Sequence, residues 1–341
     1  MSVVADPELE RLSAEAPPVT GLRFRRLQLP DDIAPLAALH NLAAENDAVD
    51  ERDSADDWAH WLTHPSGFDP ATDAFVGELD GDVVVYGQAR WSDDSDGGRN
   101  YVTGGEVAPD QRGRGIGRAV LRHNERRLRA VAASHPSDLE KRLESWAFDT
   151  QPRRIRLLES EGYTVVRYFF EMLRPTLDTI ANLPLPPGLE IRPVRPEQLR
   201  QIWDADIEAF RDEWGGMDTS EETYARRFSG PNFRPELWRV AWDGDQVAGV
   251  VMAQIQTAYN EQTGGLRGLL SGVSVRRPWR RRGLARALVA DALRGLRDDG
   301  MSSAVLGVDA ENPTGALGVY EANGFEVAHR GRIYRKPMEA G

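Results

Sequence analysis

Residues 276–283, RRPWRRRG, place a run of arginines directly before a stretch whose apolar residues recur every four positions. That spacing predicts a helix from about Leu284 to Asp298. The first turn of a helix has backbone N–H groups without internal partners and carries the positive end of the helix dipole. Gly283 would let a ligand approach this backbone closely. Three interpretations compete: a nucleic-acid patch, a solvated face, or a site for the phosphates of a cofactor.

The charge and composition of the whole chain weigh against the first interpretation. The chain has 341 residues and a formal net charge of −12, whereas a nucleic-acid binder needs a basic surface. It has no cysteine, which excludes thiol chemistry and fits a reducing cytoplasm. No apolar run is long enough to cross a membrane. We therefore expect a cytoplasmic protein that binds neither nucleic acid nor membranes. We expect no metal, because His40, His60 and His64 lack acidic partners at ligand spacing.

A second group of chemically capable residues lies downstream. Residues 302–308, SSAVLGV, predict a strand, and Asn312-Pro313 is a strong start signal for a helix. Asn323-Gly324 predicts the end of that helix, which would be about ten residues long and would carry Tyr320.

The elements that must position these groups occur twice, as an internal sequence repeat. Residues 106–121 (EVAPDQRGRGIGRAVL) match 274–289 (SVRRPWRRRGLARALV), and 157–163 (LLESEGY) match 319–325 (VYEANGF). The hairpin patterns at 75–91 and 240–255 also correspond. Each half alternates strands and helices, which predicts an α/β fold with a mixed sheet. We predict a disordered lead at 1–19, domains at 20–173 and 189–338, and a proline-rich linker at 174–188.

The paired motifs carry a family resemblance. Arg280-x-x-Gly283-x-Ala285 before a helix, followed by a strand and then Asn312…Tyr320-Glu321-x-x-Gly324-Phe325, resembles the acyl-CoA core of the GNAT N-acetyltransferase superfamily. Both halves carry the turn, and the tandem arrangement is similar to that of the mycothiol synthase family. The resemblance implies two domains whose sheets splay to admit acetyl-CoA.

The resemblance also implies roles for individual residues. Tyr320 would donate a proton to the departing thiolate of CoA. In the second copy, cofactor contacts are implied for Val273, Ser274, Val275, Arg280, Arg281, Arg282, Gly283, Leu284, Ala285, Arg286 and Asn312. In the first copy, they are implied for Val107, Arg112, Gly113, Arg114, Gly115, Ile116, Gly117 and Arg118.

The two copies differ at the reacting positions. Alignment places Leu158 opposite Tyr320 and Thr150 opposite Asn312, and a leucine cannot protonate a thiolate. The first domain would therefore bind CoA without reacting, or serve as a structural partner. Some family members use a glutamate as base on the strand before the turn, and there Glu106 stands opposite Ser274. The other carboxylates considered as bases are Asp309, Glu208 and Glu213.

The resemblance implies an acetyl-CoA-dependent N-acetyltransferase that moves an acetyl group directly to a small-molecule amine, and the differences between the copies place this transfer in the second domain. The acceptor would meet the segment 201–238, which is rich in aromatic and acidic residues. We expect a monomer or a homodimer. The alternative is a catalytically silent acyl-CoA-binding or scaffold protein built from duplicated domains.

Overall fold

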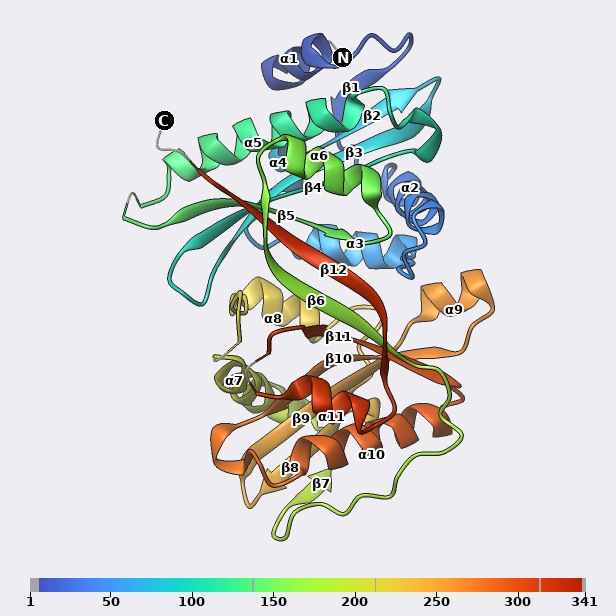
Figure 1. Ribbon diagram of the computed structural model, residues 1–341, viewed down its shortest axis with the longest axis vertical. Helices are drawn as coiled ribbons and strands as arrows, with labels where there is room; N and C mark the ends of the chain where they lie inside the picture. Colours follow the sequence, from blue (N-terminus) through green and yellow to red (C-terminus); the bar gives the residue numbers. More distant parts are fainter. Residues whose placement is uncertain (1–5, 137, 212, 313, 339–341) are drawn as a thin grey trace. The chain divides into compact units, whose positions relative to one another are not determined.

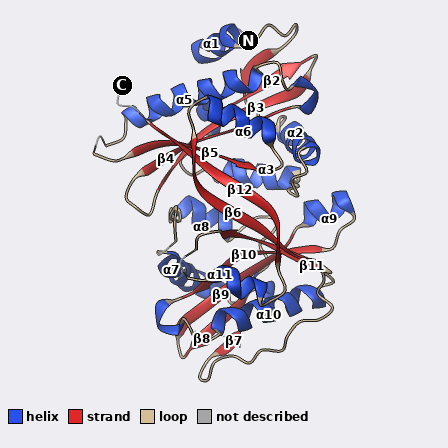
Figure 2. Ribbon diagram, viewed as in Figure 1, coloured by secondary structure: helices blue, strands red, loops and turns tan. Residues whose placement is uncertain are grey.

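The computed structural model describes residues 6–136, 138–211, 213–312 and 314–338, which form two units (Figure 1). Unit 1 comprises Met1–Val166 and Ile333–Gly341 as far as these are described, and unit 2 is Arg167–Arg332. Both units mix helices with parallel and antiparallel strands, so the predicted α/β class is confirmed (Figure 2). No helix among the described residues has the length and apolar character needed to cross a membrane.

Unit 1 contains most of the first sequence repeat. Its helices are α1 (Pro7–Glu15), α2 (Ile33–Asn46), α3 (Ala55–Thr63), α4 (Pro70–Asp73), α5 (Ile116–Ala133) and α6 (Pro152–Ser160). Its strands are β1 (Arg23–Arg26), β2 (Ala74–Leu79), β3 (Asp82–Asp93), β4 (Arg99–Val107) and β5 (Lys141–Phe148), in that order in the sheet. Alternate residues face opposite sides: Phe75 and Val85 pack against α1 and α5, whereas Val76 and Tyr86 pack against α2 and α3.

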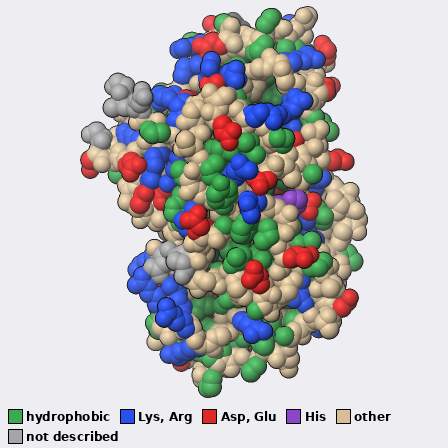
Figure 3. Space-filling model, in the orientation of Figure 1, with side chains coloured by type: hydrophobic (Ala, Val, Ile, Leu, Met, Phe, Trp, Pro, Cys, Tyr) green, Lys and Arg blue, Asp and Glu red, His purple; other side chains and the backbone are tan. Residues whose placement is uncertain are grey.

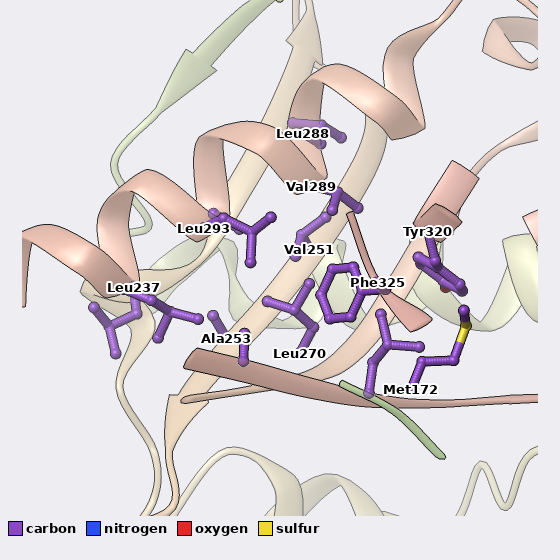
Figure 4. Packing of buried hydrophobic residues seen from close by; sticks show 14 of the residues in the cluster. Met172, Leu237, Val251, Ala253, Leu270, Leu288, Val289, Leu293, Tyr320 and Phe325 are labelled. Atoms are coloured by element: carbon purple, nitrogen blue, oxygen red, sulfur yellow. The ribbon is translucent and has the colours of Figure 1, made fainter. Parts of the chain in front are cut away.

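Unit 2 repeats this plan. Its helices are α7 (Leu199–Phe210), α8 (Glu221–Arg227), α9 (Thr257–Thr263), α10 (Leu284–Asp298) and α11 (Ala316–Glu321). Its strands β7 (Glu190–Arg192), β8 (Arg239–Asp243), β9 (Gln246–Ile255), β10 (Arg267–Val275) and β11 (Ser303–Asp309) follow the order β11-β10-β9-β8-β7. Val251, Ala253 and Leu270 face α10 in the largest core cluster, where Tyr320 and Phe325 also lie (Figure 4). Val240 and Val250 belong to the opposite cluster with Ile202 and Trp203 of α7.

The unit boundaries differ from the predicted domains because two long strands contribute to both units. β6 (Thr164–Arg174) begins in unit 1 and ends in unit 2, whereas β12 (Glu326–Pro337) begins in unit 2 and ends in unit 1. Within unit 1, Arg335 donates to Glu144 at 2.8 Å and forms an ion pair with Asp94. Lys336 binds Glu125 at 3.0 Å. The last part of β12 is thus anchored in unit 1 by charged side chains.

The prediction of a disordered lead is wrong for residues 7–15, which form α1. Asp6 caps this helix, since its carboxylate accepts hydrogen bonds from the backbone N–H groups of Glu8 and Leu9. Leu9 and Leu12, three positions apart, are buried against Phe75 and Ile116. The capping signal and the apolar spacing outweigh the acidic composition of this segment.

Candidate active site

The parallel strand pair at the centre of each unit separates before its strands end. β4 and β5 pair from Arg99–Lys141 to Val102–Glu144, but β4 continues to Val107 and β5 to Phe148. β10 and β11 pair only from Arg267–Ser303 to Leu269–Val305, and both continue by several residues. We call each region of unpaired strand ends a splay. The two registers correspond under the offsets of the sequence repeat, so both copies build the same opening.

A left-handed glycine forms the turn from each splayed strand into the long helix. Gly115 is the N-cap of α5 with φ 90°, and Gly283 is the N-cap of α10 with φ 81°. A side chain disfavours this backbone conformation. The next residue in each copy, Ile116 or Leu284, is buried and anchors the helix start. Arg281, Arg282, Gly283 and Arg286 are exposed, so the first turn of α10 is open to an anion.

Arg112 and Arg280 have a structural contact that the sequence analysis did not foresee. The Nε of Arg112 donates to the Val107 carbonyl at 2.8 Å, and the Nε of Arg280 donates to the Val275 carbonyl at 2.8 Å. Arg112 also forms an ion pair with Asp47, and Arg280 donates to the Ala209 carbonyl. Each guanidinium braces its own turn, and the exposed arginines beside Arg280 are those that remain open to a ligand.

Unit 1 contains a cavity of about 1100 Å³ at its splay. The walls come from the unpaired end of β4, from the turn into α5, from Ser145 of β5 and from α6. Of the first-copy residues predicted to contact a cofactor, the structure brings to this cavity Val107, Arg112, Gly113, Gly115, Gly117 and Arg118. Leu158, at the position aligned with Tyr320, also lines it and is buried.

Asn312 and Tyr320 both follow β11 in the chain, but their environments differ. Tyr320 is only 6% exposed and packs in the core cluster of unit 2 (Figure 4). Burial, with the Glu213 carboxylate nearby, raises the pKa of its phenol above the ordinary value. The phenol therefore stays protonated at neutral pH. Asn312 donates to both Glu213 oxygens, at 2.7 and 2.8 Å.

The helix that carries Tyr320 begins later than predicted. α11 spans Ala316–Glu321 and starts from Gly315, which has φ 77°. The side-chain oxygen of Asn312 instead accepts from the Thr314 backbone N–H at 2.8 Å, in the turn before the helix. Pro313, the other part of the predicted start signal, lies outside the described residues.

The carboxylates considered as bases in unit 2 have ionic or polar partners. Asp309 pairs with Arg167 at 2.7 Å, and Glu208 pairs with Arg276 at 2.7 Å, which holds the pKa of Glu208 below its usual range. Glu213 binds Asn312 as described above. The lowered pKa makes the Glu208 carboxylate a weaker base.

The sequence analysis missed a buried carboxylate on α7. Asp206 is 1% exposed, and burial raises its pKa, although nearby Arg227 and the Ser274 side chain oppose the shift. The distance from Asp206 Oδ2 to Arg227 Nη1 is 3.4 Å. Asp206 thus stands beside Ser274, the residue aligned with Glu106. The available signal was its place among Ile202, Trp203 and Ala209, on the buried side of the predicted helix.

In unit 1, Glu106 stands at the strand position that Ser274 has in unit 2. Burial raises the pKa of its carboxyl, and Arg154 and His40 partly oppose this effect. His40 Nδ1 lies 4.0 Å from Glu106 Oε1, and Asp53 lies 3.7 Å from the other ring nitrogen. Because the folded protein resists ionisation of Glu106, the stability of unit 1 falls as the pH rises from the ordinary glutamate pKa through the raised one.

Replacing Glu106 by glutamine should remove this loss of stability. We expect Glu106→Gln to raise the melting temperature by a few degrees at pH 7.5, with a smaller gain at pH 4.5, because the raised pKa lets the native carboxyl take up a proton as the pH falls. Thermal unfolding at both pH values measures the effect. Glu161→Gln is the control, since Glu161 forms ion pairs with Arg118 and Arg122 and should show no gain. A lower melting temperature for Glu106→Gln at pH 7.5 would contradict the expectation.

Comparison with known proteins agrees with these features. The profile of the acetyltransferase (GNAT) family matches residues 36–163 and again 199–325. These two ranges cover the two sequence repeats, so the predicted tandem arrangement is confirmed. Among solved structures, a tandem GNAT protein from the clavulanic acid biosynthesis pathway is similar in fold, with a TM-score of 0.68 at 17% identity, over 94% of this chain and 99% of that one.

Named relatives are similar along much of the chain. The mycothiol acetyltransferase of Geodermatophilus obscurus is 31% identical over 64% of this chain and 68% of its own length. The mycothiol acetyltransferase of Salinispora arenicola is 31% identical over 87% of this chain and 90% of its own length. An acyl-CoA is the donor in this family, which acetylates amines. With the family profile matching both halves, the chain belongs to the GNAT family of acetyltransferases.

Proposed function

We propose that the protein transfers an acetyl group from acetyl-CoA directly to the amine of a small molecule, and that the transfer occurs in unit 2. The observation that carries this proposal is the splay between β10 and β11, because it ends at an open helix N-terminus and has Tyr320 on the following helix. In unit 1 the residue aligned with Tyr320 is Leu158, which has no proton to give.

The cofactor would lie in this splay with its phosphates at the turn. Backbone groups of Val273 and Val275 would bind the pantetheine arm as an added strand does. The N–H groups from Arg281 to Arg286 would bind the pyrophosphate, and the exposed arginine side chains would add charge-assisted contacts. Asn312 would contact the arm through its amide, exchanging Glu213 for the ligand.

The reaction needs two proton transfers. The amine nitrogen attacks the thioester carbonyl carbon, the carbon–sulfur bond breaks, and the thiolate takes the proton of the Tyr320 hydroxyl. The attacking amine must lose a proton as the amide forms. Asp206 is our candidate for this acceptor, because burial moves its pKa towards neutrality and it stands beside Ser274 of the splayed strand.

We infer the acceptor amine from the names of the relatives. Trp203 of α7 and Tyr224 of α8 pack in one core cluster and already face the guanidinium groups of Arg227 and Arg200, so the acidic and aromatic segment is assigned no amine site beyond the proton acceptor Asp206. Because the relatives at about 30% identity are mycothiol acetyltransferases, desacetyl-mycothiol is the first acceptor to test.

We expect thiol release from acetyl-CoA to depend on an added amine. The measurement is free CoA thiol with a panel of amines that includes desacetyl-mycothiol, and mass spectrometry should find the acetylated product. Binding of acetyl-CoA without release by any amine in the panel would instead favour the silent acyl-CoA-binding protein.

A further inference from the structure

Arg154, in the first turn of α6, connects the two splayed strands of unit 1. Its Nε donates to the Trp146 carbonyl of β5 at 2.7 Å, and its Nη1 donates to the Gly105 carbonyl of β4 at 3.1 Å. Its Nη2 lies 3.5 Å from the Ser145 hydroxyl. All three partners lie beyond Val102–Glu144, the last pair between these strands. One guanidinium therefore connects the two strands in the region in which they have separated.

The position that Arg154 occupies is the one a bound cofactor would need. Under the offset of the sequence repeat, Gly105 corresponds to Val273, whose backbone we assign to the pantetheine arm. In unit 1 the carbonyl at this position already accepts a hydrogen bond from Arg154. An arm that adds to β4 as a strand would have to displace this contact and the one to Trp146 together.

Unit 2 offers an internal comparison. The offset of the second motif places Ala316 opposite Arg154, and an alanine side chain ends at its methyl group. The turn itself is held in the same way in both copies, because Arg112 and Arg280 each donate to the carbonyl of the last residue of the preceding strand. The two units therefore differ at the splay itself, where unit 1 has Arg154 and unit 2 has Ala316. They also differ at the reacting position, where unit 1 has Leu158 and unit 2 has Tyr320.

We propose that Arg154 closes the splay of unit 1 to the acyl-CoA arm, so that each chain binds acetyl-CoA in unit 2 alone. The inference rests on the proposed function, because it assumes that the arm binds in the splay of unit 2. It decides between the two roles predicted for unit 1 in favour of the structural partner. Gly105 and Ser145 line the cavity, but the Gly105 carbonyl and the Ser145 hydroxyl already face the Arg154 guanidinium there.

The test is the number of acetyl-CoA molecules that each full-length chain binds, measured by isothermal titration calorimetry. The wild type should bind one equivalent, and Arg154→Ala, which copies unit 2, should bind two. Ala316→Arg, which copies unit 1, should bind none. Arg156→Ala is the matched control, since Arg156 lines the same cavity from the same helix, and it should still bind one equivalent.

A second variant keeps the test informative if Arg154→Ala does not fold. Arg154→Lys retains the charge but lacks the rigid planar fork that reaches Trp146, Gly105 and Ser145 together, so it should also bind two equivalents. Thermal unfolding identifies the variants that remain folded.

The outcomes separate the inference from the proposed function. Two equivalents in the wild type, or one equivalent in folded Arg154→Ala and Arg154→Lys, would overturn the role of Arg154 and leave transfer in unit 2 intact. No binding by the wild type would overturn the proposed function itself. One equivalent that persists in folded Ala316→Arg would show that an arginine at this position does not close a splay, and would overturn the role of Arg154.

Discussion

Tyr320→Phe should lower kcat by about 10²–10⁴-fold while acetyl-CoA still binds, because the variant lacks only the hydroxyl that protonates the thiolate. The raised pKa of Tyr320 keeps the native phenol protonated through neutral pH, so the proton is present in the wild type. The ring stays in the core with Phe325, and phenylalanine fills the same space. Steady-state kinetics with saturating acetyl-CoA measures the loss, and calorimetry measures the retained binding.

A buried tyrosine of unit 1 provides the control for this result. Tyr334 is 0% exposed, and its hydroxyl lies 3.4 Å from Glu159. Tyr334→Phe removes a hydroxyl from an equally buried ring, and we expect it to leave kcat unchanged. Transfer would have to be assigned to unit 1 if Tyr320→Phe kept full kcat while substitutions at Gly115 or Leu158 abolished turnover.

Gly283→Ala should raise the KM for acetyl-CoA about tenfold, which corresponds to the loss of about 1.4 kcal/mol of binding. A Cβ at this position would meet no protein atom within 4 Å, so its methyl group would project into the space proposed for the pyrophosphate. The variant should also lose roughly 1–2 kcal/mol of stability, because φ at Gly283 is 81° and alanine disfavours this region.

Gly300→Ala separates the two effects of that substitution. Gly300 follows the other end of α10, has φ 91°, and would likewise meet no atom within 4 Å of a Cβ. Both variants should lower the melting temperature similarly, whereas only Gly283→Ala should change the KM for acetyl-CoA. Equal KM values for the two variants would contradict a phosphate site at the start of α10.

Local patterns were enough to predict the repeated elements. The apolar spacing after Gly283 predicted a helix to Asp298, and α10 has that span. The hairpins β2–β3 and β8–β9 also lie where the alternating patterns indicated. Such features depend on neighbours in the sequence, so a single chain reveals them. The helix α1 also had a local signal in its capping residue and apolar spacing, but we gave more weight to its acidic composition and predicted disorder.

Contacts between distant residues could not be predicted in this way. The sequence showed an arginine at 154 and an aspartate at 206, but not that Arg154 would reach two separated strands or that Asp206 would lie beside Ser274. The partners of Arg280 were equally hidden, since charge alone did not distinguish an arginine that braces a turn from one open to a phosphate. The surface mixes both signs of charge, as Figure 3 shows, and a net charge does not assign individual pairs.

The contribution of β12 to unit 1 sets an order of events during protein synthesis. Asp94 and its partner Arg335 are 241 residues apart, so unit 1, which begins to leave the ribosome first, lacks β12 until Arg335 has been added to the chain. Unit 2, complete at Arg332, has all its residues a few positions earlier. The amino-terminal half of the gene therefore does not encode a finished domain, and a fragment cut within the proline-rich segment would lack the strand that carries Arg335.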